Sequence, residues 1–172
     1  PSSDGTVAKL GGTSSMRWSF ERTGSRWLIR GRLGEVSFDL VLDEHTTPMT
    51  AVCPNDDLFN ITRKNVSLSG RGRVSSPKLG DVTLEGVGLL DHSHGLMLRE
   101  THWRWAIGAG VLADGSRIGF NLIQGFNGDK ENVFWLGDDL RALPPVEFDQ
   151  TTNAWRVFDA NGLVDITLNW EG

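Results

Sequence analysis

The sequence predicts an all-β protein made of short antiparallel strands. Apolar and polar residues alternate in short runs, the clearest of which contains Val36, Phe38, Leu40 and Leu42. The 172 residues include 21 glycines, and turn-forming dipeptides recur between the runs. No stretch repeats its apolar residues at the spacing of a long helix. Short strands separated regularly by turns favour a sandwich or a barrel.

The expected strands follow one another along most of the chain. Short alternating runs surround Trp18, Trp27 and Val36, and Pro48 and Pro54 predict a long loop over residues 43–60. Further strands are expected at residues 66–74, 82–90, 96–107, 117–123, 132–136, 155–158 and 163–170.

Turns and domain limits follow from the residues between these strands. Asp114-Gly115 and Asn161-Gly162 predict hairpin turns, and Gly137-Asp138-Asp139 predicts a third turn. The Gly/Ser/Thr-rich residues 1–15 are expected to form a flexible arm, followed by a single all-β domain over residues 16–172.

Composition excludes several classes of function. The formal net charge of −5 and the small basic clusters argue against nucleic-acid binding. No apolar window is long enough for a membrane span, and residues 1–12 lack the features of a signal peptide. Cys53 is the only cysteine, which fits a reducing, cytoplasmic setting. No nucleotide-binding or nucleophile motif is present, so no cofactor is expected.

The stretch from Asp91 to Trp135 concentrates candidate functional residues. On a strand over residues 96–107, Glu100, His102 and Arg104 would share one face, and Trp103 and Trp105 the other. The two tryptophans have two interpretations: core residues of a half-buried strand, or the wall of a cavity that holds a flat or apolar ligand.

Titratable residues in the same stretch are candidates for proton chemistry. Apolar walls raise the pKa of a carboxyl group, so Asp91 and Glu100 are the first candidate catalytic acids and Glu131 is the third. His92 and His94 have permissive spacing for a metal, but no clear third ligand accompanies them, so no metal is expected. Turn capping by Asp91 and Ser93, with exposed histidines, is the favoured interpretation.

Amides complete the candidate site. Asn127 lies in a tight loop where a positive φ is expected, and buried amides such as Asn121 need hydrogen-bond partners. The candidate ligand-binding residues are therefore His94, His102, Trp103, Trp105, Asn121, Gln124, Asn127, Asn132 and Trp135.

Several motifs resemble one bacterial family in the same order. They include LLDHSHG (89–95), THWRWAIGAG (101–110), DGSRIGFNLIQGFN (114–127) and ENVFW (131–135). The family is domain of unknown function 2804; the resemblance extends from Thr62 to the C-terminus and is loose over the first sixty residues. It implies an antiparallel lipocalin-like (calycin) barrel, or half of a double barrel, similar to carotenoid 1,2-hydratase (hydroxyneurosporene synthase), fungal pericyclase-type barrels and a lipid-linked survival-factor family. The chain is expected to be truncated relative to that family.

Three functions follow as hypotheses. The first is binding of a hydrophobic small molecule or lipid in a β-barrel cavity. The second is a hydratase, isomerase or cyclase acting on an apolar polyene or terpenoid by acid–base catalysis, for which analogy with the hydratase points to Asp91 beside Trp103. The third is carbohydrate binding, because seven tryptophans on a β scaffold can stack sugar rings. The ligand, the oligomeric state and any strands or partner chain that complete the barrel are not specified by the sequence.

Overall fold

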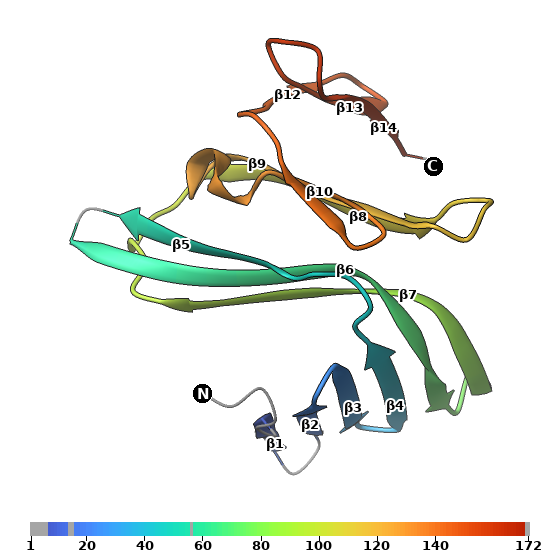
Figure 1. The fold of residues 1–172 in the computed structure, drawn as a ribbon. Coiled ribbons are helices and arrows are strands. Elements are labelled where there is room, and N and C mark those ends of the chain that lie inside the picture. Colours follow the sequence, from blue (N-terminus) through green and yellow to red (C-terminus); the bar gives the residue numbers. More distant parts are fainter. Residues whose placement is uncertain (1–6, 14–15, 56, 171–172) are drawn as a thin grey trace. The chain divides into compact units, whose positions relative to one another are not determined.

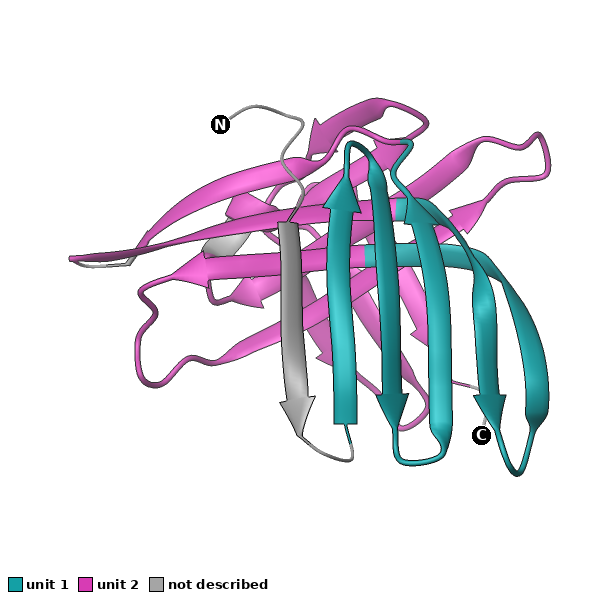
Figure 2. Cartoon of the chain, turned by 90° about the horizontal axis from the view of Figure 1, so that it is seen from below, with its two compact units in different colours: residues 1–45, 67–89 teal, residues 46–66, 90–172 magenta. Residues whose placement is uncertain are grey.

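The chain folds into antiparallel β-sheets. The computed structural model describes residues 7–13, 16–55 and 57–170, which contain fourteen strands and one short 3₁₀ helix. The chain divides into two compact units. Unit 1 comprises residues 1–45 and 67–89, and unit 2 comprises residues 46–66 and 90–172 (Figure 2).

Unit 1 is built from consecutive hairpins that share one sheet (Figure 1). Its strands are β1 (Val7–Thr13), β2 (Met16–Thr23), β3 (Arg26–Leu33), β4 (Val36–Asp43) and parts of β6 (Leu58–Ser76) and β7 (Gly80–Gly95). Strand β1 pairs with β2, so part of the expected flexible arm is a strand. The rest of that arm lies outside the described residues.

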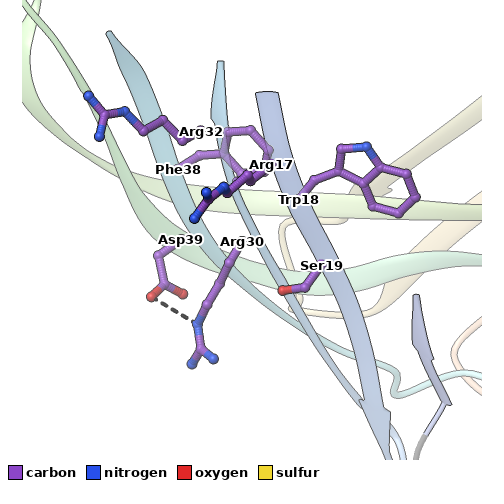
Figure 3. A pocket seen from close by; sticks show the side chains of 8 residues that line it. Arg17, Trp18, Ser19, Arg30, Arg32, Phe38 and Asp39 are labelled. Carbon is purple, nitrogen blue, oxygen red and sulfur yellow. Dashed lines mark hydrogen bonds and ion pairs between the residues drawn. The ribbon is translucent and has the colours of Figure 1, made fainter. Parts of the chain in front are cut away.

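The faces of the unit 1 sheet follow the alternation of the sequence. Cross-strand pairing sets Ile29 against Leu40, and Gly31 against Phe38. A Cβ at Gly31 would run into the Phe38 ring, so glycine leaves room for that ring on the sheet. The next residues along each strand are mostly charged, and an open pocket of this sheet is shown in Figure 3.

Unit 2 contains three groups of strands. Strand β5 (Met49–Asn55) pairs with the first part of β6. The second group is a four-stranded sheet of β8 (Trp103–Val111), β9 (Arg117–Gly125), β10 (Val133–Leu136) and β11 (Asp139–Ala142). The third is a sheet of β12 (Glu147–Gln150), β13 (Ala154–Phe158) and β14 (Asp165–Asn169). Helix η1 (Gly128–Glu131) joins β9 to β10.

Each face of the four-stranded sheet contributes to a separate core of unit 2. One core combines Ala106 and Leu122 with residues of the β12–β14 region, such as Phe148 and Val157. The other core comprises Met49, Val66, Val133 and Trp135. The β8–β11 sheet therefore packs on both sides, which explains why the consecutive residues Asn121, Leu122 and Ile123 of β9 are all buried.

The structure confirms the all-β antiparallel class. Hairpin turns lie at all three predicted places, with Gly115, Gly137 and Gly162 at positive φ. Asn127 also has a positive φ, at 60°, as its loop sequence predicts. Pairing among the described residues leaves the sheets open, which agrees with the half-barrel form of the prediction.

Two predicted boundaries are wrong for identifiable reasons. Residues 43–60 are not one long loop, because β5 occupies Met49–Asn55. Pro54 is tolerated there since β5 is the last strand of its sheet, where a missing N–H costs no ladder bond.

The predicted strand over residues 96–107 begins only at Trp103, and β7 extends to Gly95 instead of ending near Leu90. Gly95, at φ 135°, ends β7 where a Cβ would meet the Phe59 backbone. The predicted turn at Asp91–Ser93 is therefore strand.

Candidate functional site

A row of buried polar side chains on β6 forms the base of the candidate site. Asn60, Thr62 and Lys64 alternate along the strand and are 2%, 0% and 4% exposed. Residues two apart on a strand share a face, so all three side chains lie on the same side of β6. The paired residues of β5 opposite them include Cys53 and Met49, both buried.

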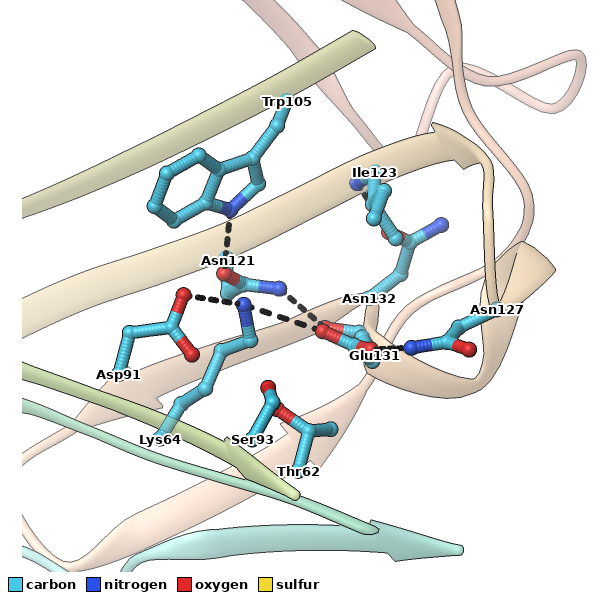
Figure 4. Close-up of polar contacts among 10 residues, drawn as sticks. All are labelled: Thr62, Lys64, Asp91, Ser93, Trp105, Asn121, Ile123, Asn127, Glu131 and Asn132. Carbon is cyan, nitrogen blue, oxygen red and sulfur yellow. Dashed lines mark hydrogen bonds and ion pairs between the residues drawn. The ribbon is translucent and has the colours of Figure 1, made fainter. Parts of the chain in front are cut away.

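Lys64 is the centre of the site. Its Nζ lies 3.0 Å from Asp91 Oδ2 and 3.1 Å from Glu131 Oε2. The same ammonium lies 4.7 Å from the centroid of the Trp105 ring, within the range of a cation–π interaction. Strands β7 and β8 and helix η1 thus each bring one partner to a lysine on β6 (Figure 4).

Amides connect these partners to one another. Trp105 Nε1 donates to Asn121 Oδ1 at 2.8 Å, and Asn121 Nδ2 donates to the Glu131 carbonyl oxygen at 2.8 Å. Asn127 Nδ2 donates to the Glu131 carboxylate. The positive φ of Asn127 belongs to the tight loop that positions this amide. We call Lys64, Asp91, Trp105, Asn121, Asn127 and Glu131 the Lys64 network.

At the other end of the row, Thr62 and Asn60 have fewer hydrogen-bond partners than Lys64. Ser93 Oγ donates to Thr62 Oγ1 at 2.9 Å. Asn60 has neither side-chain polar atom bonded to any described residue, although both atoms are buried. Burial raises the pKa of the Cys53 thiol, and the nearby Glu131 carboxylate raises it further, so Cys53 is a neutral thiol rather than a reactive thiolate.

The charge balance of the network limits what it can bind. One ammonium faces two carboxylates, so the three groups carry one more negative than positive formal charge. Glu131 is 2% exposed, whereas the Asp91 side chain is 37% exposed. The network therefore has a closed end at Glu131 and an accessible carboxylate at Asp91, which favours neutral or cationic groups over anions.

Four of the predicted site residues are brought together by this network: Asp91, Trp105, Asn121 and Asn127. Glu131, the third candidate acid, also belongs to it. Trp103 lies two residues from Trp105 on β8, is 51% exposed and packs 5.7 Å from the Phe126 ring between centroids.

The other predicted site residues have different surroundings. Glu100 and His102 bond to each other at 3.2 Å with side chains more than four-fifths exposed, and they precede β8 instead of sharing its face. The His94 ring lies 5.3 Å from the His92 ring, in the exposed end of β7.

Gln124, Asn132 and Trp135 make contacts that support the sheets. Arg104 Nη1 donates to Gln124 Oε1 at 3.4 Å. Asn132 Oδ1 accepts from the Ile123 N–H at 2.6 Å, and its Nδ2 donates to the Pro144 carbonyl at 3.2 Å. Trp135 is fully buried and donates from Nε1 to the Thr47 carbonyl at 2.7 Å.

The residues that sequence reasoning missed are Asn60, Thr62, Lys64 and Ser93. A signal for three of them exists, because Asn60, Thr62 and Lys64 alternate with Phe59 and Ile61 in period two. The pattern was missed because the expected loop runs to residue 60 and the next expected strand begins only at residue 66. On most strands the apolar residues are buried and the polar residues are exposed, whereas here the polar residues Asn60, Thr62 and Lys64 are buried.

Other kinds of site have less support in the described part of the chain. Within it, no group of three His, Cys, Asp or Glu side chains is placed to hold a metal ion. None of its helices combines the length and apolar character needed to cross a bilayer.

Fold and site together define an antiparallel all-β protein with a buried, charged centre built around one lysine. A family model, described as "Domain of unknown function (DUF2804)", matches residues 4–169. The chain therefore belongs to the DUF2804 family, and the match includes the first sixty residues, where the motifs alone indicate only a loose resemblance. No curated protein and no solved structure matches the chain.

Proposed function

We propose that unit 2 binds a hydrophobic small molecule or lipid, whose apolar part lies against Trp103 and Trp105 and whose polar group meets the Lys64 network. A lipocalin-like cavity, similar to that of calycins, is the form of site that this proposal implies. The single, buried free thiol of Cys53 fits a cytoplasmic protein.

The observation that carries the proposal is the environment of Trp105. Its indole N–H is held by Asn121 and its ring by the Lys64 ammonium, yet the residue remains 38% exposed. A large apolar ring that is oriented by buried groups and still exposed is suited to contact a ligand. Trp103 extends the same face of β8 with a second exposed ring.

The unpaired amide of Asn60 supports a ligand with a polar group. A buried polar atom without a partner costs about 1–3 kcal/mol, so native proteins rarely retain one without a use. Asn60 lies on the face of β6 that also presents Thr62 and Lys64. A hydroxyl or carbonyl group of a ligand would satisfy this amide.

The charge of the network predicts which polar group is accepted. An anionic head group would be repelled by the surplus carboxylate charge, while a hydroxyl would donate to Asp91. We therefore expect an alcohol to bind more tightly than the fatty acid of the same chain length.

A titration followed by tryptophan fluorescence tests the proposal, with dodecanol and dodecanoate as probes. Dodecanol should quench the fluorescence with the lower Kd, and Trp105→Leu should abolish that binding. Trp155→Phe is the matched control, because Trp155 packs against Phe148 in the other core of unit 2 and should leave binding unchanged. Tighter binding of dodecanoate would refute the role of the network, and absence of binding by both probes would refute the proposal.

Acid–base catalysis on an apolar polyene or terpenoid is the second candidate, and the 37% exposed Asp91 carboxylate, which contacts the same Lys64 ammonium as the Trp105 ring, favours it. Asp91→Asn should then abolish turnover of a bound polyene while leaving its Kd within about twofold. Retained turnover in this variant would exclude Asp91 as the acid.

Carbohydrate binding is the third, because Trp103 and Trp105 are both exposed on one strand. A glycan array without hits would exclude it.

A further inference from the structure

The charged face of the unit 1 sheet is a ladder in which arginines are matched by carboxylates. Arg26 Nε lies 2.6 Å from Asp43 Oδ1, and Arg71 Nη1 lies 2.8 Å from Asp43 Oδ2. Two rows further along the same face, Arg30 Nε lies 3.2 Å from Asp39 Oδ2. In these rows each cation has an acid on the neighbouring strand, as expected for cross-strand pairs that stabilise a sheet.

One row of the same face breaks this pattern. Arg17 on β2 is directly opposite Arg32 on β3, and the row continues on β4 with Ser37. Arg32 Nε donates to the Gly34 carbonyl at 2.9 Å, and no carboxylate among the described residues pairs with Arg17 or Arg32. Like charges directly opposite each other destabilise a sheet, so stability does not explain this pair.

The two arginines border an open pocket with a volume of about 470 Å³. Arg30, Asp39 and Ser19 line the same pocket, and Figure 3 shows the contact of the Arg30 guanidinium with the Asp39 carboxylate. Three guanidinium groups against one carboxylate give the pocket a positive surplus within a chain whose net charge is −5.

We propose that this pocket binds the phosphate group of a small phosphate ester or a phosphorylated head group. A guanidinium presents paired N–H donors that match the oxygens of a phosphate, and the two guanidinium groups of one cross-strand row match its charge of nearly −2. The bound phosphate supplies the negative charge that the Arg17–Arg32 row lacks, while Ser19 offers one hydroxyl donor. This site lies in unit 1 and is independent of the function proposed for unit 2.

The test measures binding of inorganic phosphate to the full chain by calorimetry, against chloride at matched ionic strength. Arg17→Gln and Arg32→Gln should each weaken phosphate binding at least about tenfold. Arg26→Gln is the matched control: it removes an exposed arginine of the same face that Asp43 already neutralises, so phosphate binding should be retained.

A stability measurement separates this role from a structural one. Without phosphate, Arg17→Gln should raise the urea midpoint because it removes a like-charge pair, whereas Arg26→Gln should lower it. Phosphate should raise the midpoint of the wild type and of Arg26→Gln, but not of Arg17→Gln. If wild type and Arg17→Gln bind phosphate equally, or if phosphate acts no differently from chloride, the proposal is overturned.

A second arm identifies the source of the phosphate. Vesicles of phosphatidylcholine with phosphatidic acid are compared with vesicles of phosphatidylcholine alone in a sedimentation assay. Binding to phosphatidic acid that Arg17→Gln abolishes assigns the pocket to a lipid head group. Binding of inorganic phosphate without vesicle binding assigns it to a soluble phosphate ester.

Discussion

Replacement of Lys64 by methionine should destabilise unit 2 more than loss of any surface ion pair. Methionine matches the unbranched lysine stem, so the substitution removes the charge with little change of volume. Glu131, at 2% exposure, then keeps a buried carboxylate without its cation. Removal of one partner from a buried pair costs about 3–5 kcal/mol, and loss of the contact with Trp105 adds about 0.5–2 kcal/mol.

Urea unfolding followed by tryptophan fluorescence measures this effect. With a slope of about 2 kcal/mol per molar urea, a loss of about 4 kcal/mol lowers the midpoint by about 2 M. Arg156→Met is the matched control, because Arg156 pairs with Asp165 at 2.8 Å on the surface, where water and salt screen the pair and its loss changes stability little. A Lys64→Met protein within about 1 kcal/mol of wild type would refute the view that Lys64 neutralises a buried carboxylate.

Three further predictions concern packing, pH and thiol chemistry. Gly119→Ala should cost about 1–3 kcal/mol because its Cβ would run into Val66, whereas Gly110→Ala, with its nearest neighbour atom 3.8 Å away, should cost little. Backbone N–H groups bonded to the Asp159 carboxylate lower its pKa, so its stabilising effect is complete above the unfolded value of about 3.9 and is lost as pH falls. Asp159→Ala should therefore flatten the loss of stability below about pH 5 in urea titrations. Cys53, at 1% exposure, should react with a thiol reagent only when urea unfolds the chain.

Each of these predictions has a result that contradicts it. Equal urea midpoints for the two glycine variants would mean that β9 can shift away from Val66. An unchanged acid slope in Asp159→Ala would assign the acid sensitivity to another carboxylate. Rapid labelling of the native thiol would show that the β5–β6 pair opens readily.

Local features of the fold could be predicted from the sequence because they depend on neighbouring residues. Asn127 has the positive φ that its loop predicts, and the Asp114-Gly115 hairpin follows from turn chemistry alone. The Val36–Leu42 alternation became β4 because one face of that strand is apolar along its whole length. The site was harder to predict, since Lys64 and Asp91 are 27 positions apart in the sequence and only strand pairing brings them together.

Polar residues that are buried on a strand locate the site better than the titratable residues that stand out in the sequence. A polar residue at every second position of a strand usually marks an exposed face, yet Thr62 and Lys64 are buried because β7 and η1 bring partners to them. The exposed Glu100–His102 pair shows the opposite case. Those titratable residues seemed chemically informative in the sequence, but they form an ordinary surface contact.

Stability alone does not explain why this family member keeps a charged centre in unit 2. Replacement of a buried ion pair by apolar side chains of similar size is often neutral or stabilising by about 1–4 kcal/mol. Lys64→Met combined with Glu131→Leu should therefore recover much of the stability that Lys64→Met loses. If the double variant is stable but no longer binds dodecanol, the network serves to orient Trp105 and to receive the polar group of the ligand. If it binds dodecanol as tightly as wild type, the exposed tryptophans bind without the network, and its charges need another explanation.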